Sequence, residues 1–432
     1  MTLRDAVRSA IAPIYIRARL LQERIQSGVE WNPFDREYLA DPYPACRRLR
    51  ERDPCHYSPL TGMLVVSRYK DVDEILRDHR RFGSVRRGGA GRRSRLSGAR
   101  RQLDHILPRL DPPDHTRLRG LVERAFTADR IARMENRIRD TAHAMLDRVG
   151  DTTEFDLMSV LATPLPVVVI ADMVGVPPEI REPFRRWAEQ IKRISEPSLT
   201  PDQLRATMEA MHEFDRHFAP IVEARRDDPG SDLISGLAQS EKDGQTMNAA
   251  EILATLRLLL MAGCDPPADL IGNGLRALLQ HPEQLELLRK RPDLIPDAIE
   301  ELLRYDAPVQ LGRRYLIEDV RVGNRQRQAG SQVLLLQGAA NRDPEVFNDP
   351  DTLDVTRKGA GHLSFAQGIH RCMGAPLARL MGRVVLEELL DRFDDIRFGA
   401  REPVYRPSYV FRGLRHLDVR VRYGGGRRPP GP

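Results

Sequence analysis

The chain has 432 residues, of which 41% are hydrophobic and 30% are charged, a composition that is typical of a globular protein with a large core. Its 68 basic residues exceed its 62 acids, but only five of the basic residues are lysines. Because this arginine bias is typical of a GC-rich genome, the positive charge is weak evidence for nucleic-acid binding, and we expect no nucleic-acid partner. The four cysteines are too few and too scattered for a disulfide framework, which favours a reducing, cytoplasmic location.

The two ends of the chain differ from the rest. Residues 1–30 carry charges every few positions around a short apolar stretch, and they lack the small-residue cleavage site of a secretory signal. They predict an amphipathic arm packed on the body, with binding to a membrane surface as the alternative. No apolar run reaches the roughly 18 residues of a transmembrane helix, so we expect no membrane partner. We expect a single domain over 31–422 and a disordered tail over 423–432.

The first elements of the body alternate between helix and strand. A helix follows the proline turn near residue 42, a strand-like apolar run occupies 63–69, and helical periodicity returns over 70–82 and 111–127. Between these helices, residues 85–101 are rich in arginine, glycine and serine and predict a flexible cationic loop. This loop is either simply solvated or contacts an acidic substrate or an acidic carrier protein.

The later elements are mostly helical. Residues 164–191 predict two helices joined by a Gly-Val-Pro-Pro turn. Residues 249–263 are apolar on nearly every side, which is typical of a helix that runs through the middle of a large domain. A further helix over 296–308 precedes short strands that extend to about residue 336. The sequence therefore predicts a mainly α fold with a minor β part.

A short motif, FAQGIHRCMG, covers residues 365–374 and places Cys372 at the start of a predicted helix. The helix dipole and the free N–H groups there favour a thiolate, which is the form of sulfur that binds metals. Gly368 and Gly374 allow a tight turn and the close approach of a flat ligand. A lone thiolate cannot build a zinc or iron–sulfur site, but it suffices as the one axial protein ligand of a haem.

This motif resembles the haem-binding loop of the cytochrome P-450 family. The matching residues are Phe365, Gly368, His370, Cys372 and Gly374. The resemblance implies that Cys372 is the axial ligand of the haem iron. Ala366 stands where many relatives have glycine, which is a small departure from the pattern.

A second match lies upstream, in the order that the family has. Glu301 and Arg304 are three residues apart on one face of a predicted helix, so they can pair. In the family such a pair also locks to a meander, which residues 341–357 resemble. The resemblance implies that Glu301 and Arg304 support the haem loop structurally.

The third match concerns the two propionates of the haem. Arg314 resembles the arginine with which the family holds one of them. His115 and Arg119, four residues apart on one helical face, resemble the clamp on the other, which His370 completes. Charge-assisted hydrogen bonds to carboxylates give such residues a physical reason to be there.

The resemblance covers roughly residues 30 to 422 and implies the cytochrome P-450 fold, with haem b held between the long central helix and the cysteine loop. It implies a bacterial haem-thiolate monooxygenase that inserts one oxygen atom from O2 into a hydrophobic small molecule. Because the sequence includes no fused reductase, a ferredoxin and a ferredoxin reductase are the implied electron donors. The expected substrate is a secondary metabolite of antibiotic biosynthesis, a polyketide or an aromatic acid, free or bound to a carrier protein. We expect a monomer.

The sharpest departure from the family lies in the predicted central helix, after Ala262 and Gly263. The family usually has an acid followed by threonine, whereas this chain has Asp265 followed by Pro266 and Pro267. The threonine of relatives helps water to deliver protons during oxygen activation, and Pro266 has no hydroxyl for that task. The prolines also predict a kink that frees two backbone carbonyls. Either water or a substrate hydroxyl relays the protons instead, or the enzyme uses peroxide or catalyses a non-hydroxylating reaction.

The expected substrate pocket draws on Ala262, Val309, Gln310 and Tyr409, by analogy with the family. These positions are mostly apolar and suit a hydrophobic substrate. A third hypothesis is a non-catalytic haem protein that senses a ligand or a gas. The retained acid at Asp265 and the lack of a recognisable output module in the sequence argue against it.

Overall fold

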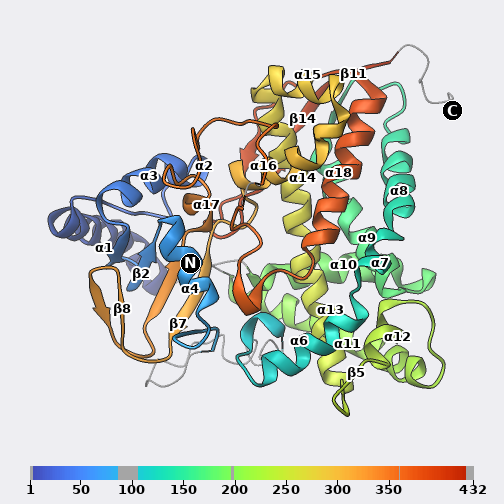
Figure 1. The fold of residues 1–432 in the computed structure, drawn as a ribbon, viewed down its shortest axis with the longest axis horizontal. Coiled ribbons are helices and arrows are strands. Elements are labelled where there is room, and N and C mark those ends of the chain that lie inside the picture. The colour runs from blue at the N-terminus through green and yellow to red at the C-terminus, as the bar shows by residue number, and fades with distance from the viewer. Residues whose placement is uncertain (1–2, 86–105, 196–198, 360, 425–432) are drawn as a thin grey trace.

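The computed structural model describes residues 3–85, 106–195, 199–359 and 361–424. Apart from Val85, the predicted cationic loop lies outside the described residues, and so does the predicted tail beyond residue 424. Within the described part, helices form the larger body and a strand-rich part lies to one side of it (Figure 1). The predicted mainly α fold with a minor β part is confirmed. The division into an arm, a single domain and a tail stays a prediction.

The helices before the centre of the chain are α1 (Leu3–Ser27), α2 (Arg36–Ala40), α3 (Tyr43–Arg52), α4 (Tyr69–Arg77), α6 (Asp114–Ala125), α7 (Ala128–Ala132), α8 (Glu135–Asp147), α9 (Pro164–Val174), α10 (Arg181–Ile191), α11 (Pro201–Asp227) and α12 (Leu233–Ala238). Those that follow are α13 (Ala249–Gly263), α14 (Asp265–Gln280), α15 (Pro282–Lys290), α16 (Ile295–Tyr305), α17 (Gln337–Ala340) and α18 (Ala375–Arg392).

The strands are short. They are β1 (Cys55–Ser58), β2 (Met63–Val66), β3 (Phe82–Gly83), β4 (Glu154–Asp156), β5 (Glu241–Lys242), β6 (Gln245–Thr246), β7 (Gly312–Leu316), β8 (Val320–Val322), β9 (Arg325–Arg327), β10 (Gln332–Leu335), β11 (Phe393–Phe398), β12 (Val404–Tyr405), β13 (Leu414–His416) and β14 (Asp418–Tyr423).

The largest sheet joins segments that are far apart in the sequence. Its order is β1-β2-β10-β7-β3, and β10 runs parallel to β2 but antiparallel to β7. Val333 of β10 therefore lies between Leu64 of β2 and Arg314 of β7. This register fixes Arg314 in a central strand of the sheet, where its side chain is buried.

The helical body is organised around the central helix, which runs as two segments placed end to end (Figure 1). α18, the helix that follows the cysteine motif, packs against both α14 and α16. The apolar sequence of α13 is buried on most sides, as expected for a helix through the core, because α9, α10 and α11 pack around it.

The predicted kink in this helix is a complete break. α13 ends at Gly263, Cys264 leaves the ideal helical geometry with φ −101° and ψ −63°, and α14 begins at Asp265. Pro266 and Pro267 have no N–H group, so the helical bonds to the carbonyls of Ala262 and Gly263 cannot form. The first turn of a new helix needs no such donors, and the prolines are accommodated there.

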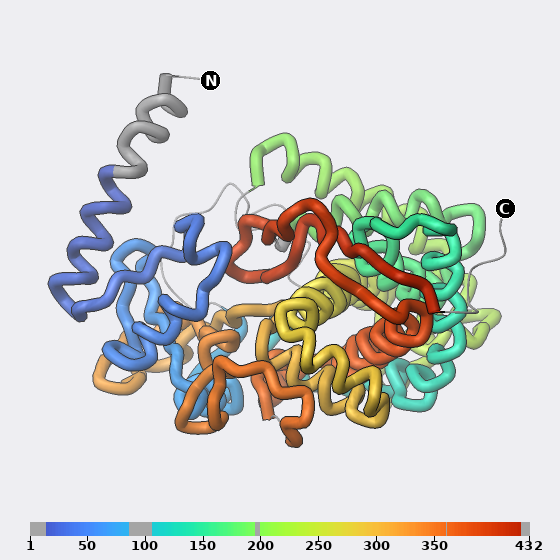
Figure 2. The backbone as a smooth tube through the Cα atoms, turned by 90° about the horizontal axis from the view of Figure 1, so that it is seen from above, coloured from blue at the N-terminus to red at the C-terminus, as the bar shows by residue number. Residues whose placement is uncertain are grey.

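Residues 14–27 of the N-terminal helix α1 lie at the edge of the molecule (Figure 2). Its C-terminal end is fixed by the buried Glu23, whose carboxylate accepts hydrogen bonds from the backbone N–H of Trp31 at 2.8 Å and from the hydroxyl of Ser58 at 2.6 Å. Among the described residues, we find no helix with the length and hydropathy needed to cross a bilayer.

Candidate active site

The cysteine loop is a tight turn directly before α18. The backbone N–H of Cys372 donates to the carbonyl oxygen of Phe365 at 2.9 Å, and a short 3-10 turn over Gly368–His370 lies between them. Two residues of the loop have left-handed backbone conformations, Ala366 with φ +55° and Gly368 with φ +70°. This conformation is costly for any residue with a side chain, so the loop stores some strain at Ala366.

Gly368 is required for a second reason. A Cβ atom at this position would lie only 2.5 Å from the carbonyl oxygen of Leu76 and 2.9 Å from Cα of Arg77. The cysteine loop therefore rests directly on the backbone at the end of α4, and only glycine allows this approach. The sequence motif predicted a tight turn and the close approach of a flat ligand at this glycine; the contact with the backbone of α4 was not predicted.

Cys372 is solvent-accessible, but surrounding protein atoms dominate the electrostatics of its thiol. Burial raises the pKa of this thiol above its usual value, and the backbone N–H groups of Gly374 and Ala375 oppose the rise only in part. The predicted stabilisation of a thiolate by the start of the helix is present, but burial outweighs it. A bound metal ion would supply the missing stabilisation of the negative sulfur.

A cluster of basic side chains comes together from three elements near this loop. The rings of His115 in α6 and His370 in the cysteine loop lie 4.3 Å apart, centroid to centroid. Burial and the charge of Arg119 lower the pKa of His115 to about 4. Burial and the charges of Arg314 and His115 lower the pKa of His370 to about 3. Burial also lowers the pKa of Arg314 to about 10.

Few acceptors within the protein satisfy this basic cluster. Both ring nitrogens of the buried His115 lack a hydrogen-bond partner among the described residues. Arg314 donates to the carbonyl of the adjacent Arg313 at 2.9 Å, and the hydroxyl of Ser84 lies 3.0 Å from Nε2 of His370. Buried donors of this kind are expensive unless they are paired, so the cluster is suited to an anionic ligand.

Arg119 is the residue of the predicted clamp whose side chain already has hydrogen-bond partners within the protein. Its guanidinium donates to Glu123 at 2.7 Å and to the carbonyl of Arg371 in the cysteine loop at 3.0 Å. It therefore ties α6 to the loop. The structure brings together near the cysteine loop all four residues predicted to hold the two propionates, and it leaves His115 and Arg314 the freest to bind carboxylates.

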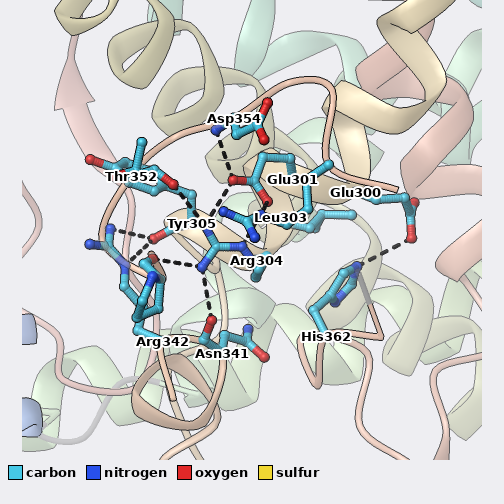
Figure 3. Close-up of polar contacts among 12 residues, drawn as sticks. Glu300, Glu301, Leu303, Arg304, Tyr305, Asn341, Arg342, Thr352, Asp354 and His362 are labelled. Atoms are coloured by element: carbon cyan, nitrogen blue, oxygen red, sulfur yellow. Dashed lines mark hydrogen bonds and ion pairs between the residues drawn. The ribbon is translucent and has the colours of Figure 1, made fainter. Parts of the chain in front are cut away.

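A buried ion pair braces the region behind the loop (Figure 3). Glu301 and Arg304 of α16 are fully buried, and the guanidinium of Arg304 forms two hydrogen bonds to Glu301, at 2.7 and 2.8 Å. The same guanidinium donates to the carbonyl oxygens of Asn341, Pro350 and Thr352, at 3.0, 2.7 and 3.1 Å. The predicted pairing and its lock on the segment over 341–357 are thus both present in the structure.

The brace continues to the cysteine loop through two further residues. The side chain of Asn341 donates to the hydroxyl of Ser364 at 2.8 Å, and Ser364 is followed directly by Phe365, the first residue of the motif. Arg357 also approaches Glu301, with Nε 3.2 Å from Oε2. Sequence analysis did not single out Arg357, although it ends the segment that resembles the meander.

Asp265, at the break in the central helix, is held by two basic residues from distant segments. Its carboxylate lies 3.1 Å from Nζ of Lys192, which follows α10, and 3.2 Å from Nη1 of Arg406, which lies between β12 and β13. Burial alone would lower the pKa of Lys192, but Asp265 and Glu189 raise it. The acid predicted at this position is therefore part of an ion-pair network whose other members the sequence did not indicate.

The expected substrate-pocket residues fall into two groups. Ala262, near the end of the otherwise buried α13, is exposed, and Val309 is half-buried and forms an isolated bridge with Phe411. The amide of Gln310, in contrast, is buried and donates to the carbonyl of Ala307 at 2.8 Å and to Tyr43 at 3.3 Å. Its side chain is used within the protein. Tyr409 packs edge-on against the ring of Phe34, with centroids 5.4 Å apart.

Known proteins resemble this chain over nearly its whole length. Residues 55–404 match the family described as Cytochrome P450. The polyketide biosynthesis cytochrome P450 PksS of Bacillus subtilis is 34% identical over 402 residues, which cover 90% of this chain and 98% of that protein. The cytochrome P450 monooxygenase PikC of Streptomyces venezuelae is 36% identical over 423 residues, which cover 94% of this chain and 99% of that protein.

The fold gives the same result. A solved structure of P450BioI, in complex with an acyl carrier protein ligated to hexadec-9Z-enoic acid, aligns with a TM-score of 0.83 and 33% identity. The alignment covers 89% of this chain and 99% of that one. The chain belongs to the cytochrome P450 family. It is a cytochrome P450 monooxygenase with the family's fold, and its cofactor is a haem.

The residues around the cysteine loop fit this cofactor. Haem presents one iron that needs an axial ligand and two carboxylates that need donors. Cys372 provides an accessible sulfur. The ring nitrogens of His115, which have no hydrogen-bond partner among the described residues, and the buried guanidinium of Arg314 provide sites for the carboxylates. With this assignment the buried basic groups near the loop have a reason to be there.

Proposed function

We propose that this enzyme inserts one atom of O2 into a hydrophobic secondary metabolite, a polyketide or an aromatic acid, free or bound to a carrier protein. The observation that supports this most is the similarity to PksS, named for polyketide biosynthesis, along 90% of the chain. The similarity to P450BioI, solved with an acyl carrier protein, supports the carrier-bound form of the substrate. The exposed Ala262 and the half-buried Val309 suit an apolar ligand.

In this proposal the chain's own residues bind, orient and brace the cofactor. Cys372 ligates the iron of haem b, while His115, Arg314 and His370 bind its carboxylates and Arg119 fixes α6 on the loop. Glu301 and Arg304 hold the loop from behind. The bound haem supplies the iron that activates O2. Electrons come from a ferredoxin and its reductase, and an acidic ferredoxin would suit a chain with 68 basic and 62 acidic residues.

Proton delivery must differ from that of relatives with a threonine. The break at Cys264 leaves the carbonyls of Ala262 and Gly263 without helical donors, so they can accept from a water molecule. Asp265, which is paired with Lys192 and Arg406 beside this break, orients that water. A hydroxyl group of the substrate is the other possible relay.

The proposal is tested by spectroscopy followed by turnover. The reduced protein should bind carbon monoxide with the absorption spectrum of a thiolate-ligated haem, and Cys372→Ser should abolish that spectrum. A library of polyketides and aromatic acids, free and carrier-bound, should then include a compound that shifts the haem spectrum. With ferredoxin, reductase and O2, that compound should gain one oxygen atom by mass spectrometry. Turnover that yields no oxygenated product would contradict the proposal.

A second candidate is a haem-thiolate enzyme that is driven by peroxide or catalyses a non-hydroxylating reaction. Pro266 in place of the hydroxyl-bearing residue is the observation that favours it. Product formation with hydrogen peroxide, but not with reduced ferredoxin and O2, would show that the enzyme is driven by peroxide. A product without an added oxygen atom would show that the reaction is not a hydroxylation. A protein that binds ligands with spectral shifts yet turns over none of them would instead be the non-catalytic sensor.

A further inference from the structure

The N-terminal helix α1 carries an apolar face that the rest of the described protein does not cover. The exposed fractions of Ile14, Leu21 and Ile25 are 70%, 55% and 76%, and Ala18 on the same face is also exposed. Tyr15, beside this face, is 47% exposed. Four of the eight large hydrophobic residues that are exposed in the described part of the chain therefore belong to this one helix.

The spacing of these residues forms a continuous stripe. Ile14, Ala18, Leu21 and Ile25 follow one another at intervals of four, three and four residues, which places them on one side of a helix. In the sequence, the same spacing continues upstream to Val7 and Ile11. An exposed apolar stripe over residues 14–25, on a helix at the edge of the molecule, calls for a partner outside the protein (Figure 2).

Basic residues flank this stripe. Arg17 and Arg24 lie on one side of it by helical spacing, and Arg19 lies toward the other. Arg24 is paired with Glu30, whose carboxylate lies 3.1 Å from its Nε, so Arg17 and Arg19 carry the uncompensated positive charge. The only acid between residues 14 and 27 is Glu23, which points inward and is buried against Trp31 and Ser58. The outward face of this part of α1 is therefore apolar in the middle and positive at its edges.

The C-terminal end of α1 suits a peripheral attachment. The C-terminal end is anchored to β1, since His56 lies between two carboxylates, 3.4 Å from Glu23 and 3.1 Å from Asp53. Because this anchor is buried, the helix is held by the body while its apolar stripe stays outside. A surface that binds the stripe would thus carry the whole enzyme with it.

We propose that α1 binds in the plane of an anionic membrane surface, with the stripe in the acyl–headgroup boundary and its arginines at the lipid phosphates. This attachment departs from the expectation that the chain has no membrane partner. In-plane binding needs only an apolar face with basic edges and no complementary shape. A second copy of this chain is a poorer fit, because it would present the same arginines. Three large side chains also fall short of the roughly 800 Å² per partner of a specific protein interface.

The experiment is vesicle cosedimentation of the full-length holoenzyme. Vesicles of phosphatidylcholine with added phosphatidylglycerol should bind the enzyme, vesicles of phosphatidylcholine alone should bind it much more weakly, and added salt should weaken the binding. The combined variant Ile14→Ser, Leu21→Ser and Ile25→Ser should bind the anionic vesicles at least about tenfold more weakly, because it removes three apolar side chains from the interface.

The matched control is Val346→Ser with Val404→Ser, which removes two exposed apolar side chains elsewhere, 47% and 49% exposed. It should leave vesicle binding unchanged, and the carbon monoxide spectrum of each variant reports that it is folded. Equal binding of wild type and the α1 variant would overturn the proposal, as would a lack of binding by the wild type. If the α1 variant instead lowers the mass of the enzyme in sedimentation velocity without vesicles, a second copy is the occupant.

Discussion

Two groups of buried polar side chains lie near the cysteine loop, and they differ in how completely the protein satisfies them. Arg304 has Glu301 and three backbone carbonyls as partners, so its charge is fully paired inside the protein. His115 and Arg314 are also buried, but the described protein offers them hardly any acceptor. A satisfied buried charge stabilises the fold, whereas an unsatisfied one is a cost that folding alone does not explain.

This difference separates structural residues from binding residues without reference to sequence motifs. Removing a member of the satisfied group should damage the fold whether or not haem is bound. Removing a member of the unsatisfied group should spare the fold and weaken the hold on haem. The following predictions test this contrast, beginning with the largest effect.

Arg304→Ala should destabilise the protein by about 3–5 kcal/mol, because it leaves Glu301 buried without its cation. The free energy of unfolding, measured by urea titration of the haem-free and haem-bound forms, should fall in both. Arg205→Ala is the matched control, since it breaks the pair with Asp202, which has the same three-residue spacing but is exposed. It should cost less than about 1 kcal/mol. Similar losses of stability in Arg304→Ala and Arg205→Ala would contradict the claim that the buried pair is structural.

Arg314→Met should have the opposite effect, because it should weaken the binding of haem without destabilising the haem-free protein. Without haem, it removes a buried cation whose attraction to Asp111 does not offset the cost of its burial, so the stability of the haem-free protein should stay unchanged or rise. With haem, it removes a donor to a carboxylate, so the transfer of haem to apomyoglobin should become at least about tenfold faster. His115→Phe should behave in the same way. A large loss of stability in the haem-free form would place these residues with the structural group.

Glu300→Gln tests another charge that has partners within the protein. We expect a smaller loss of stability than for Arg304→Ala, and a loss that depends on pH. Burial alone would raise the pKa of Glu300, but hydrogen bonds from Arg379 and His362 lower it from 4.5 to about 2. A carboxylate with a lowered pKa adds stability that is fully present above pH 4.5 and is lost as the pH falls toward 2. The wild type should therefore exceed the variant by about 1–2 kcal/mol at neutral pH. In urea titrations this difference should shrink below pH 4.5. A difference in stability between wild type and variant that does not change with pH would contradict this prediction.

Ala366→Gly should change the folding stability least, and it tests the strain in the cysteine loop itself. Glycine removes the strain of a left-handed alanine, and the gain in folding stability should be about 0.5–1 kcal/mol after the entropy cost of glycine in the unfolded chain. Ala378→Gly in α18 is the control and should lose stability, because its backbone is helical. Thermal unfolding of the holoenzyme measures both. A loss of stability in both variants would mean that the loop relaxes around alanine without cost.

Local patterns in the sequence predicted the parts of the site that depend on local geometry. The turn around Cys372, the need for glycine at 368, the pairing of Glu301 with Arg304 and the break caused by Pro266 all follow from residues a few positions apart. Each of these is set by backbone conformation or helical spacing, which short sequences specify.

The partners contributed by distant segments could not be predicted. Lys192 and Arg406 meet Asp265 only because three separate segments pack together, and no local pattern marks either residue as a ligand of that acid. The same holds for Gln310, which looked like a pocket residue until the fold placed its amide against Tyr43. Side-chain pairing between distant segments depends on tertiary packing, which a single sequence does not encode in any short window.

The contact between Gly368 and the end of α4 also governs when the enzyme can mature. The loop rests on the backbone of Leu76, and β2 pairs with β10 across a similar separation in the chain. On a ribosome, the N-terminal strands emerge long before the cysteine loop exists, and they must wait for it. With Cys372 as the proposed haem ligand, capture of the cofactor should be a late event in biogenesis, and a nascent chain stalled before residue 372 should not retain it.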